Sequence, residues 1–400
     1  MLCFHIATYA YLAWALAGSF AIYLWSRPSV RSLTGTLLLG ALLAAIYGFE
    51  QGGPLLGTCP GFLGLGALGS LGLAALWSGP EQRQSSLDTC LAACLFPLFP
   101  IVAGFALPVA GISHLMTYDS FLYAFDAQLG QPPSFLVGQF LARSGAIRQL
   151  CYFGYEALPL AMAIGFALER NRPRKNAGNI MLGFIMAAAG GFLLYNLYPA
   201  VGPVHVFGAQ FPYSPPLAGS PPFGLIAVQT GPPRNAMPSV HMAIALLILW
   251  NSRLGPRLWR IVAAALLGIT VLATLGFGEH YLVDLVVAVP FAVLVQGLAA
   301  SGVPWRNGAR VAAVATGALL VLAWVAYLRL PCPPLAGKGA LAWCLLCASA
   351  SASLMLESRL NRAARVGRVG AMVNQGEHAD SREARPIMRL CWRERGELHD

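Results

Sequence analysis

The sequence predicts an all-α fold, a polytopic helical bundle that spans a membrane, and two observations support this. Of the 400 residues, 57% are apolar and only 10% are charged, whereas soluble proteins carry about 25% charged residues. The apolar runs are about 20 residues long, which is the length that a helix needs to cross a bilayer. The strands of a membrane barrel would instead appear as alternating segments of about ten residues. The composition therefore excludes an ordinary soluble domain, and the run length favours helices.

Eleven apolar runs are expected to form membrane-spanning helices. They lie near residues 5–26, 34–56, 61–78, 87–112, 150–168, 179–199, 238–251, 258–277, 281–300, 307–329 and 337–356. The first run lacks a basic start and an obvious cleavage site, so we expect a span rather than a cleaved signal peptide. The run at 238–251 is short, and we expect it to begin earlier or to be sheltered inside the bundle.

The formal net charge of +10 comes from arginines that gather in a few loops and in the tail. These basic clusters are Arg27 and Arg31, Arg170 to Lys175, Arg253 to Arg260, Arg306 and the tail, with Arg143, Arg148, Arg234 and Lys338 as exceptions. The number of predicted spans between successive clusters places all of the clusters, but not the exceptions, on one side of the membrane. That side is cytoplasmic by the positive-inside rule, so we expect a multi-pass cell-membrane protein and no nucleic-acid partner.

Two long segments, 113–149 and 200–237, fall on the opposite, outer side. Their proline and glycine content predicts a structured but non-regular cap, and long loops of this kind commonly form lids or binding loops. Asp119 and Asp126 in the first segment are expected either to bind a polar headgroup or to cap helices and turns. In the tail, an arginine recurs at every third residue from 359 to 368, which predicts a basic helix before a polar, disordered remainder.

Two histidines and an aspartate lie at the edges of apolar runs on the outer side. His241 follows Ser239 in a Pro-Ser-Val-His sequence, and His280 precedes Asp284 in His-Tyr-Leu-Val-Asp. Ionisable groups at the edge of a span are costly, so they indicate a functional site. Residues four apart share one face of a helix. The carboxylate of Asp284 is therefore expected to hold the imidazole of His280 in one tautomer.

These motifs resemble those of the type 2 phosphatidic acid phosphatase superfamily, which carries Pro-Ser-x-His and then His-x-x-x-Asp. The form His-Tyr-x-x-Asp is similar to the inositol phosphorylceramide synthase and sphingomyelin synthase branch. Two departures from the phosphatases fit that branch better. The stretch 194–199 lacks the cations of a Lys-x6-Arg-Pro element, and Thr274 stands where an arginine is usual.

The resemblance implies a domain organisation with a phosphatase-like core. A six-helix core is expected over residues 87–300. N-terminal spans at 1–86 and C-terminal spans at 301–356 would flank it, and a basic cytoplasmic tail would follow at 357–400.

The resemblance also implies phosphoryl transfer through a phosphohistidine. His280 would be the nucleophile, Asp284 would orient it, and His241 would protonate the leaving oxygen and deprotonate the incoming one. Ser239 and amides at a helix start would hold phosphate oxygens. Arg234 is the one cation just before the motif and is expected to contact phosphate, although it equally fits an ordinary loop arginine. No metal and no other cofactor is expected.

The expected substrate is a phospholipid or a polyprenyl phosphate that reaches the site from the membrane. Either water or an alcohol such as ceramide, diacylglycerol or inositol would accept the phosphoryl group, and the motifs leave hydrolysis and transfer both open. Two alternatives have other functions: a lipid transporter, suggested by the number of spans, and a non-catalytic membrane protein that retains the fold. The sequence leaves the oligomeric state open.

Overall fold

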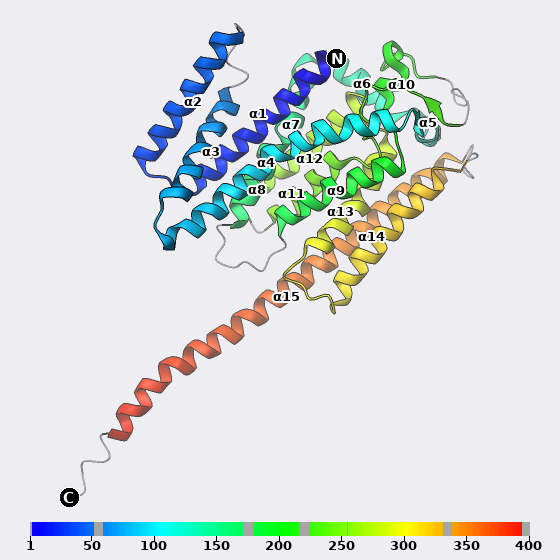
Figure 1. The fold of residues 1–400 in the computed structure, drawn as a ribbon. Coiled ribbons are helices and arrows are strands. Elements are labelled where there is room, and N and C mark those ends of the chain that lie inside the picture. Colours follow the sequence, from blue (N-terminus) through cyan, green and yellow to red (C-terminus); the bar gives the residue numbers. More distant parts are fainter. Residues whose placement is uncertain are drawn as a thin grey trace, which may run out of the picture.

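The protein is a bundle of long helices with small elements gathered at one end (Figure 1). In the computed structural model the backbone is described for residues 2–51, 59–170, 179–216, 224–253, 255–330 and 338–393, and side chains for the same ranges except 2–10, 48–51, 59, 81 and 367–393. The long helices are α1 (Leu2–Trp25), α2 (Val30–Gln51), α3 (Cys59–Trp77), α4 (Pro80–Ser113), α7 (Gly145–Glu156), α8 (Leu158–Arg170), α9 (Ile180–Leu197), α11 (Val240–Ser252), α12 (Arg257–Gly276), α13 (Leu282–Ala299), α14 (Gly308–Tyr327) and α15 (Gly339–Arg393). This architecture confirms the predicted polytopic helical fold.

Within the described residues, eight helices are long and apolar enough to span a membrane, or nine if α7 and α8 count as one. The described parts of all eleven predicted runs are largely helical. Val240–Ser252 is a shorter apolar helix, as is Tyr11–Trp25, the part of α1 whose side chains are described. Among the described residues, eight or nine of the eleven predicted spans are therefore supported. The short run near 238–251 lies inside the bundle as expected, since Ala243 to Ile248 are all buried.

The predicted span at 150–168 is a broken pair of helices rather than one straight helix. α7 and α8 meet at an angle of 52° around Ala157. Pro159 lies just after the break, and a proline disfavours helical geometry at the residue before it and lacks the N–H that a continuous helix would use. Pro159 therefore accounts for the break, which the length of the apolar run does not reveal.

The outer segments contain more regular structure than predicted. The segment 113–149 holds α5 (Asp119–Ala127), α6 (Pro133–Arg143) and the start of α7, while the described part of 200–237 holds α10 (Pro203–Phe207) and the short 3-10 helix η2 (Gly208–Gln210). A two-stranded antiparallel sheet joins the two segments, with β1 (Met116–Thr117) paired to β2 (Ile226–Ala227). The prediction of a non-regular cap is therefore wrong for much of its length.

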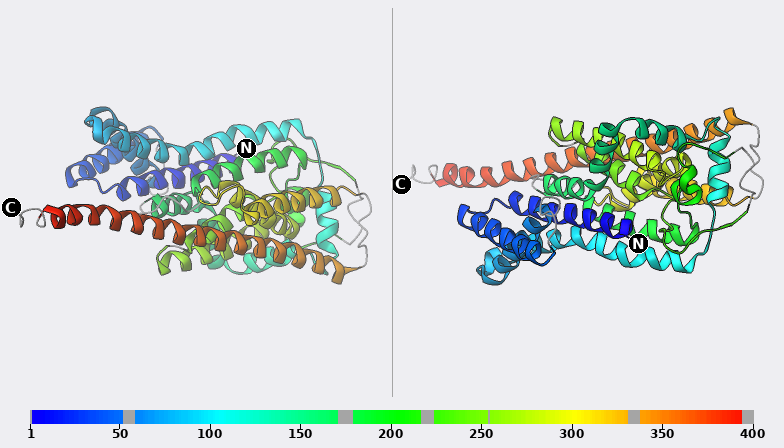
Figure 2. Two further views of the ribbon diagram at one scale, coloured as in Figure 1. Left: turned by 90° about the horizontal axis from the view of Figure 1, so that it is seen from below. Right: turned by 90° about the horizontal axis from the view of Figure 1, so that it is seen from above.

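The predicted disordered end of the tail is also helical. α15 continues from the C-terminal span to Arg393 and projects beyond the bundle in every view (Figure 2). Arginine, alanine, glutamate and methionine recur along this part of the chain, and these residues favour helix even where nothing packs against them.

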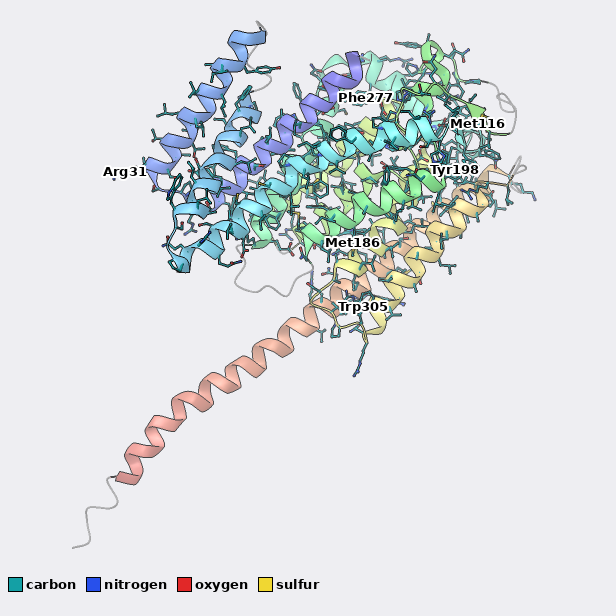
Figure 3. All side chains as sticks on the ribbon, in the orientation of Figure 1. Arg31, Met116, Met186, Tyr198, Phe277 and Trp305 are labelled. Carbon is teal, nitrogen blue, oxygen red and sulfur yellow. The ribbon has the colours of Figure 1, made fainter. Side chains whose placement is uncertain are left out.

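The bundle has two distinct ends, and the order of the helices places the motif residues at one of them. α4, α9 and α12 end where α11 and α13 begin, and α5, α6, α10 and the small sheet close that end (Figure 1). Figure 3 shows Met116 at this end and Arg31 far away at the other. Arg253 directly follows α11, Arg257 is the first residue of α12, and Arg306 lies between α13 and α14. All three therefore lie at the helix ends opposite the motif residues. The loop with Arg172, Arg174 and Lys175 lies outside the described residues. The assignment of the basic end to the cytoplasm remains a prediction.

α13 lies at the centre of the bundle, packed against α9, α11, α14 and α15. Nearly its whole length is buried, including Pro290 and Phe291. Gly317 lets α14 approach very closely, because a Cβ atom there would lie 2.9 Å from both Leu294 N and Pro290 O. The helix that follows the second histidine motif is thus fixed on several sides.

Candidate active site

His280 lies in the tight turn between α12 and α13 and is only 2% exposed. The backbone N–H groups of Glu279 and His280 both donate to the carbonyl oxygen of Thr274, at 3.1 and 3.2 Å. Gly278 has φ +74°, a conformation that glycine adopts without strain. Thr274, which stands where the phosphatases usually carry an arginine, therefore supports the turn through its backbone carbonyl. Its hydroxyl donates to Thr270 O at 2.7 Å.

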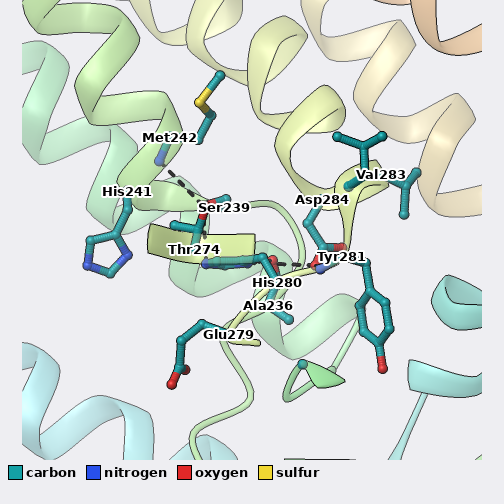
Figure 4. A network of polar contacts seen from close by, with 12 residues as sticks. Ala236, Ser239, His241, Met242, Thr274, Glu279, His280, Tyr281, Val283 and Asp284 are labelled. Carbon is teal, nitrogen blue, oxygen red and sulfur yellow. Dashed lines mark hydrogen bonds and ion pairs between the residues drawn. The ribbon is translucent and has the colours of Figure 1, made fainter. Parts of the chain in front are cut away.

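The imidazole of His280 is held at both nitrogens (Figure 4). Nδ1 lies 2.8 Å from Ala236 O, and Nε2 lies 3.1 Å from Ser239 Oγ. A carbonyl oxygen can only accept, so Nδ1 carries the proton in the neutral ring. Nε2 then has the free lone pair and accepts from the Ser239 hydroxyl. This tautomer gives Nε2 the electronic form of a nucleophile.

Asp284 lies beside this ring, but not through the shared helical face that was predicted. His280 precedes α13 by two residues, so the two side chains do not share a helical face. The carboxyl group folds back to the helix start, where Oδ2 accepts from Tyr281 N at 2.8 Å and lies 3.6 Å from His280 Nδ1. Its Oδ1 has no hydrogen-bond partner among the described residues. Ala236 O makes the direct bond to Nδ1, and Asp284 supplies buried negative charge close to it.

Ser239 is the N-cap residue of α11 and joins the two motifs. Its Oγ accepts from Met242 N at 3.3 Å, and its backbone N–H donates to Asp284 O at 3.3 Å. The side chain is fully buried. Because the first N–H groups of a helix have no acceptor within that helix, the start of α11 retains the polarity that favours anions.

His241 sits two residues further along and contacts side chains from α1 and α7. Its ring stacks on Tyr155, with ring centres 4.3 Å apart, and Nδ1 lies 3.1 Å from the Tyr155 hydroxyl. Tyr11 approaches edge-on at 5.9 Å. The contact at Nδ1 leaves Nε2 for a substrate oxygen. The sequence pattern did not single out Tyr11 or Tyr155. Tyr155 and Glu156 form a polar pair within an apolar run, however, and polar residues in such a run indicate a functional site.

The hydrogen bonds of the Arg234 side chain are to backbone carbonyl groups and not to the histidines of the two motifs. Its side chain is fully buried. Nε donates to His114 O at 2.8 Å, Nη1 to Pro232 O at 2.8 Å, and Nη2 to Val228 O and Gln229 O at 3.2 and 3.0 Å. Four of the five guanidinium N–H groups are therefore used. This geometry favours a structural role, tying the end of α4 to the loop before α11, over the predicted phosphate contact.

Two aspartates of α5 cap backbone N–H groups, which is one of the two roles expected for them. Asp119 accepts from Val201 N and Gly202 N at 2.9 to 3.2 Å, and Asp126 accepts from α13. Burial is the main reason that the pKa of both carboxyl groups is raised, in Asp126 to about 8, while the N–H donors lower it. Both side chains are fully buried, and their oxygens face the backbone.

The surroundings of the two histidines are acidic. Glu279 precedes His280 and lies 3.7 Å from His205 Nε2. Glu156, next to Tyr155, is 5% exposed and its Oε2 has no hydrogen-bond partner among the described residues. The residues found in contact with His241 and His280 include no cation. In the described part of the chain, no group of three or more histidine, cysteine or acidic side chains is arranged to hold a metal ion.

These features define a polytopic helical membrane protein with a histidine and carboxylate site at one end of its bundle. Residues 120–298 match the family model of the PAP2 superfamily. The chain therefore contains a PAP2 superfamily domain, which runs from α5 to α13 and includes both motifs. The searches of curated proteins and of solved structures returned no match. The superfamily predicted from the motifs is confirmed over this range, and the narrower resemblance to the synthase branch remains a prediction.

Proposed function

We propose that the protein is a membrane enzyme that cleaves or transfers the phosphoryl headgroup of a lipid through a phosphohistidine on His280. The observation that carries the proposal is the tautomer of this residue. Nδ1 is bound to Ala236 O, and Nε2 directs its lone pair at the Ser239 hydroxyl. The PAP2 superfamily match over the same residues supports this reaction class.

In the first step, Nε2 of His280 attacks phosphorus while the bond from phosphorus to the leaving oxygen breaks. His241 donates a proton to that oxygen. The imidazole becomes cationic when it is phosphorylated, and the carboxylate of Asp284, 3.6 Å from Nδ1, stabilises that charge. The Ser239 hydroxyl turns from Nε2 to a phosphate oxygen, assisted by the start of α11.

In the second step, His241 takes a proton from an incoming water or alcohol. The incoming oxygen attacks phosphorus, the bond to Nε2 breaks, and His280 returns to its neutral form. Both groups thus end the cycle in their starting states. Water as acceptor makes the protein a phosphatase, and an alcohol makes it a headgroup transferase.

The charges around the histidines favour a phosphodiester over a phosphomonoester. Asp284, Glu279 and Glu156 all lie on this side of the bundle, and Arg234 is committed to carbonyl groups. A phosphomonoester carries close to two negative charges near neutral pH, and repulsion between like charges is strong in a partly desolvated site. A singly charged diester meets less repulsion, which agrees with the synthase-like form of the second motif.

We further propose that the site faces the outside of the cell membrane. The basic residues Arg253 and Arg257 follow the opposite ends of the helices that begin or end at the site. The positive-inside rule assigns that basic end to the cytoplasm. A lipid in the outer leaflet could then reach His280 sideways.

The test is an assay of purified protein with labelled phosphatidate, polyprenyl diphosphate, phosphatidylinositol and phosphatidylcholine, each with and without ceramide or diacylglycerol. We expect product from at least one phosphodiester and an acid-labile label on the protein that His280→Ala removes. His114→Ala is a matched control, because His114 lies at the same end but bonds to Asn196 Oδ1 at 3.1 Å. An unchanged amount of labelled protein after His280→Ala would overturn the nucleophile assignment.

A further inference from the structure

The first turn of α13 carries part of the candidate active site, and its own residues do not supply all the hydrogen-bond acceptors that it needs. The first N–H groups of a helix have no acceptor within the helix. The N–H of Tyr281, just before α13, is taken by Asp284 Oδ2 at 2.8 Å. The N–H groups of Leu282 and Val283 then require acceptors from elsewhere, because a buried N–H without a partner costs free energy.

Asp126 supplies both acceptors from a distant part of the chain. Its Oδ2 accepts from Leu282 N at 2.7 Å, and its Oδ1 accepts from Val283 N at 3.2 Å. The two segments are 156 residues apart in the sequence for the first of these bonds. Asp126 is fully buried. It therefore acts as an N-terminal cap that α5 provides for α13.

α5 itself is held firmly, so it gives Asp126 a fixed position. Phe125 packs edge-on against Trp324 of α14, with ring centres 5.5 Å apart. The Ser120 hydroxyl bonds to Gly224 O, and the Tyr123 hydroxyl donates to Pro216 O at 2.5 Å. At the other end of the helix, Asp119 holds the backbone that follows α9. These contacts join α5 to the outer segments and to the C-terminal spans.

The first turn of α13, which Asp126 caps, sets the positions of His280 and Asp284. Leu282 follows His280 by two residues, and Val283 directly precedes Asp284. Any shift of this turn changes the 3.6 Å separation of Asp284 Oδ2 from His280 Nδ1 and the direction of Nε2. A misplacement of about 1 Å in an active site can lower the rate about 10²-fold.

We propose that Asp126 is a positioning residue, which holds the first turn of α13 so that Asp284 and the nucleophilic nitrogen of His280 stay aligned. This proposal rests on the proposed role of His280. Asp126 itself touches neither the substrate nor His280. It acts on kcat through the backbone of Leu282 and Val283.

The test compares Asp126→Ala, which removes both acceptors, with Asp126→Asn, which keeps one. We expect kcat to fall about 10²-fold in the alanine variant, with KM within about twofold of the wild type. The asparagine variant should restore part of the loss. Amide hydrogen exchange measured on peptides that cover 278–287 should become faster in both variants, in the order alanine, asparagine, wild type.

Glu357→Gln is the matched control for loss of a buried acid. Glu357 is 2% exposed and binds Arg253 Nη1 at 2.6 and 2.7 Å, at the far end of α11 from Ser239. We expect it to lower thermal stability and leave kcat per folded protein unchanged. If Asp126→Ala does not fold, Asp126→Asn gives the kcat, KM and exchange data.

The outcomes separate this proposal from the proposed function. Unchanged kcat in the Asp126 variants, with His280→Ala inactive, would overturn the positioning role alone. Full activity of His280→Ala would overturn the proposed function, and the hydrogen exchange would still report whether Asp126 caps α13. Equal loss of kcat per folded protein in Glu357→Gln would mean a general effect of destabilisation, which also overturns the positioning role.

Discussion

At the scale of single residues, the site consists of two histidines that are held in different ways. His280 is fixed by a carbonyl and a hydroxyl on its two nitrogens, while His241 is fixed by the ring and hydroxyl of Tyr155. The first arrangement suits a nucleophile, since one nitrogen keeps its lone pair. The second leaves one nitrogen for proton transfer.

Replacement of Asp284 by asparagine should lower turnover but preserve the fold. Asparagine has the same volume, and its oxygen can still accept from Tyr281 N, but the negative charge beside His280 Nδ1 is lost. By analogy with other histidines oriented by a carboxylate, we expect kcat to fall about 10²-fold or more. Steady-state kinetics and a thermal melt measure the two effects. Wild-type rates in this variant would make Asp284 a structural residue.

Arg234→Lys should lower stability rather than substrate affinity. A lysine ammonium cannot reach four carbonyl oxygens that are arranged around a planar guanidinium. Loss of hydrogen bonds to a buried charged group should cost about 2 kcal/mol or more in free energy of unfolding. Thermal melts and kcat/KM per folded protein decide the point. A tenfold or larger fall in kcat/KM at unchanged stability would instead support the phosphate contact expected from the sequence.

The raised pKa of Asp126 predicts that stability falls as the pH rises from acidic to neutral values. Its pKa is about 8 in the folded protein, mainly because of burial, and about 3.9 in an unfolded chain. Between these values the folded state binds more protons than the unfolded state, so stability falls as pH rises from about 4 to about 8. Melting temperatures across this range should fall less in Asp126→Asn, which cannot titrate. Parallel curves for the two proteins would show that Asp126 does not contribute.

At the scale of helices, the position of the site depends on how α13 is packed. α11 brings Ser239 to it, α5 caps it, and α14 runs directly against it. The contact between α13 and α14 is close because Gly317 has no side chain. The C-terminal spans, which lie beyond the matched family domain, thus support the helix that carries Asp284.

Two glycine substitutions should therefore change stability in opposite directions. Gly317→Ala places a methyl group 2.9 Å from Leu294 N and Pro290 O, and such overpacking should cost about 1 to 3 kcal/mol. Gly268 lies in α12 with nothing within 4 Å of an added Cβ atom. Gly268→Ala should stabilise the protein by about 0.5 to 1 kcal/mol. Thermal melts in detergent measure both, and a stable Gly317→Ala variant would mean that α14 shifts without cost.

At the scale of the whole molecule, the two ends of the bundle differ in chemistry. One end carries the histidines, the buried carboxyl groups and the small outer elements, and the other carries Arg253, Arg257 and the projecting helix α15 (Figures 1 and 2). A membrane enzyme that takes its substrate from one leaflet requires such a one-sided arrangement. We expect the end with Arg253 and Arg257 to face the cytoplasm, because the positive-inside rule places basic residues there.

Cysteine labelling in intact cells tests this orientation, in a background without reactive native cysteines. Tyr213 is 69% exposed at the site end, and Arg260 is exposed near the other end. An impermeant reagent should label Tyr213→Cys in intact cells and Arg260→Cys only after permeabilisation. Labelling of Arg260→Cys with protection of Tyr213→Cys would invert the topology and move the site to the cytoplasmic face.

The sequence by itself determined the class of fold and the residues of the two motifs. Long apolar runs require helices in a bilayer, since every backbone polar group must find its partner within the segment. Ionisable residues at the edges of these runs stand out because their burial is costly. His241, His280 and Asp284 could be selected on these grounds alone, and the resemblance to the phosphatase motifs added Ser239. The apolar runs also located the long helices, but not the break at Pro159, the helices of the outer segments or the far end of α15.

Only the tertiary structure decided how these residues are held. Ala236 O bonds to His280 across 44 residues, Tyr155 to His241 across 86, and Asp126 to Leu282 across 156. Arg234 likewise reaches His114 O across 120 residues, which ties its guanidinium group to the backbone. No periodic pattern encodes such pairs, because a hydrogen bond between distant segments depends on how the helices pack. The identity of the proposed catalytic residues is therefore local information, and their tautomer, alignment and charge balance belong to the folded bundle.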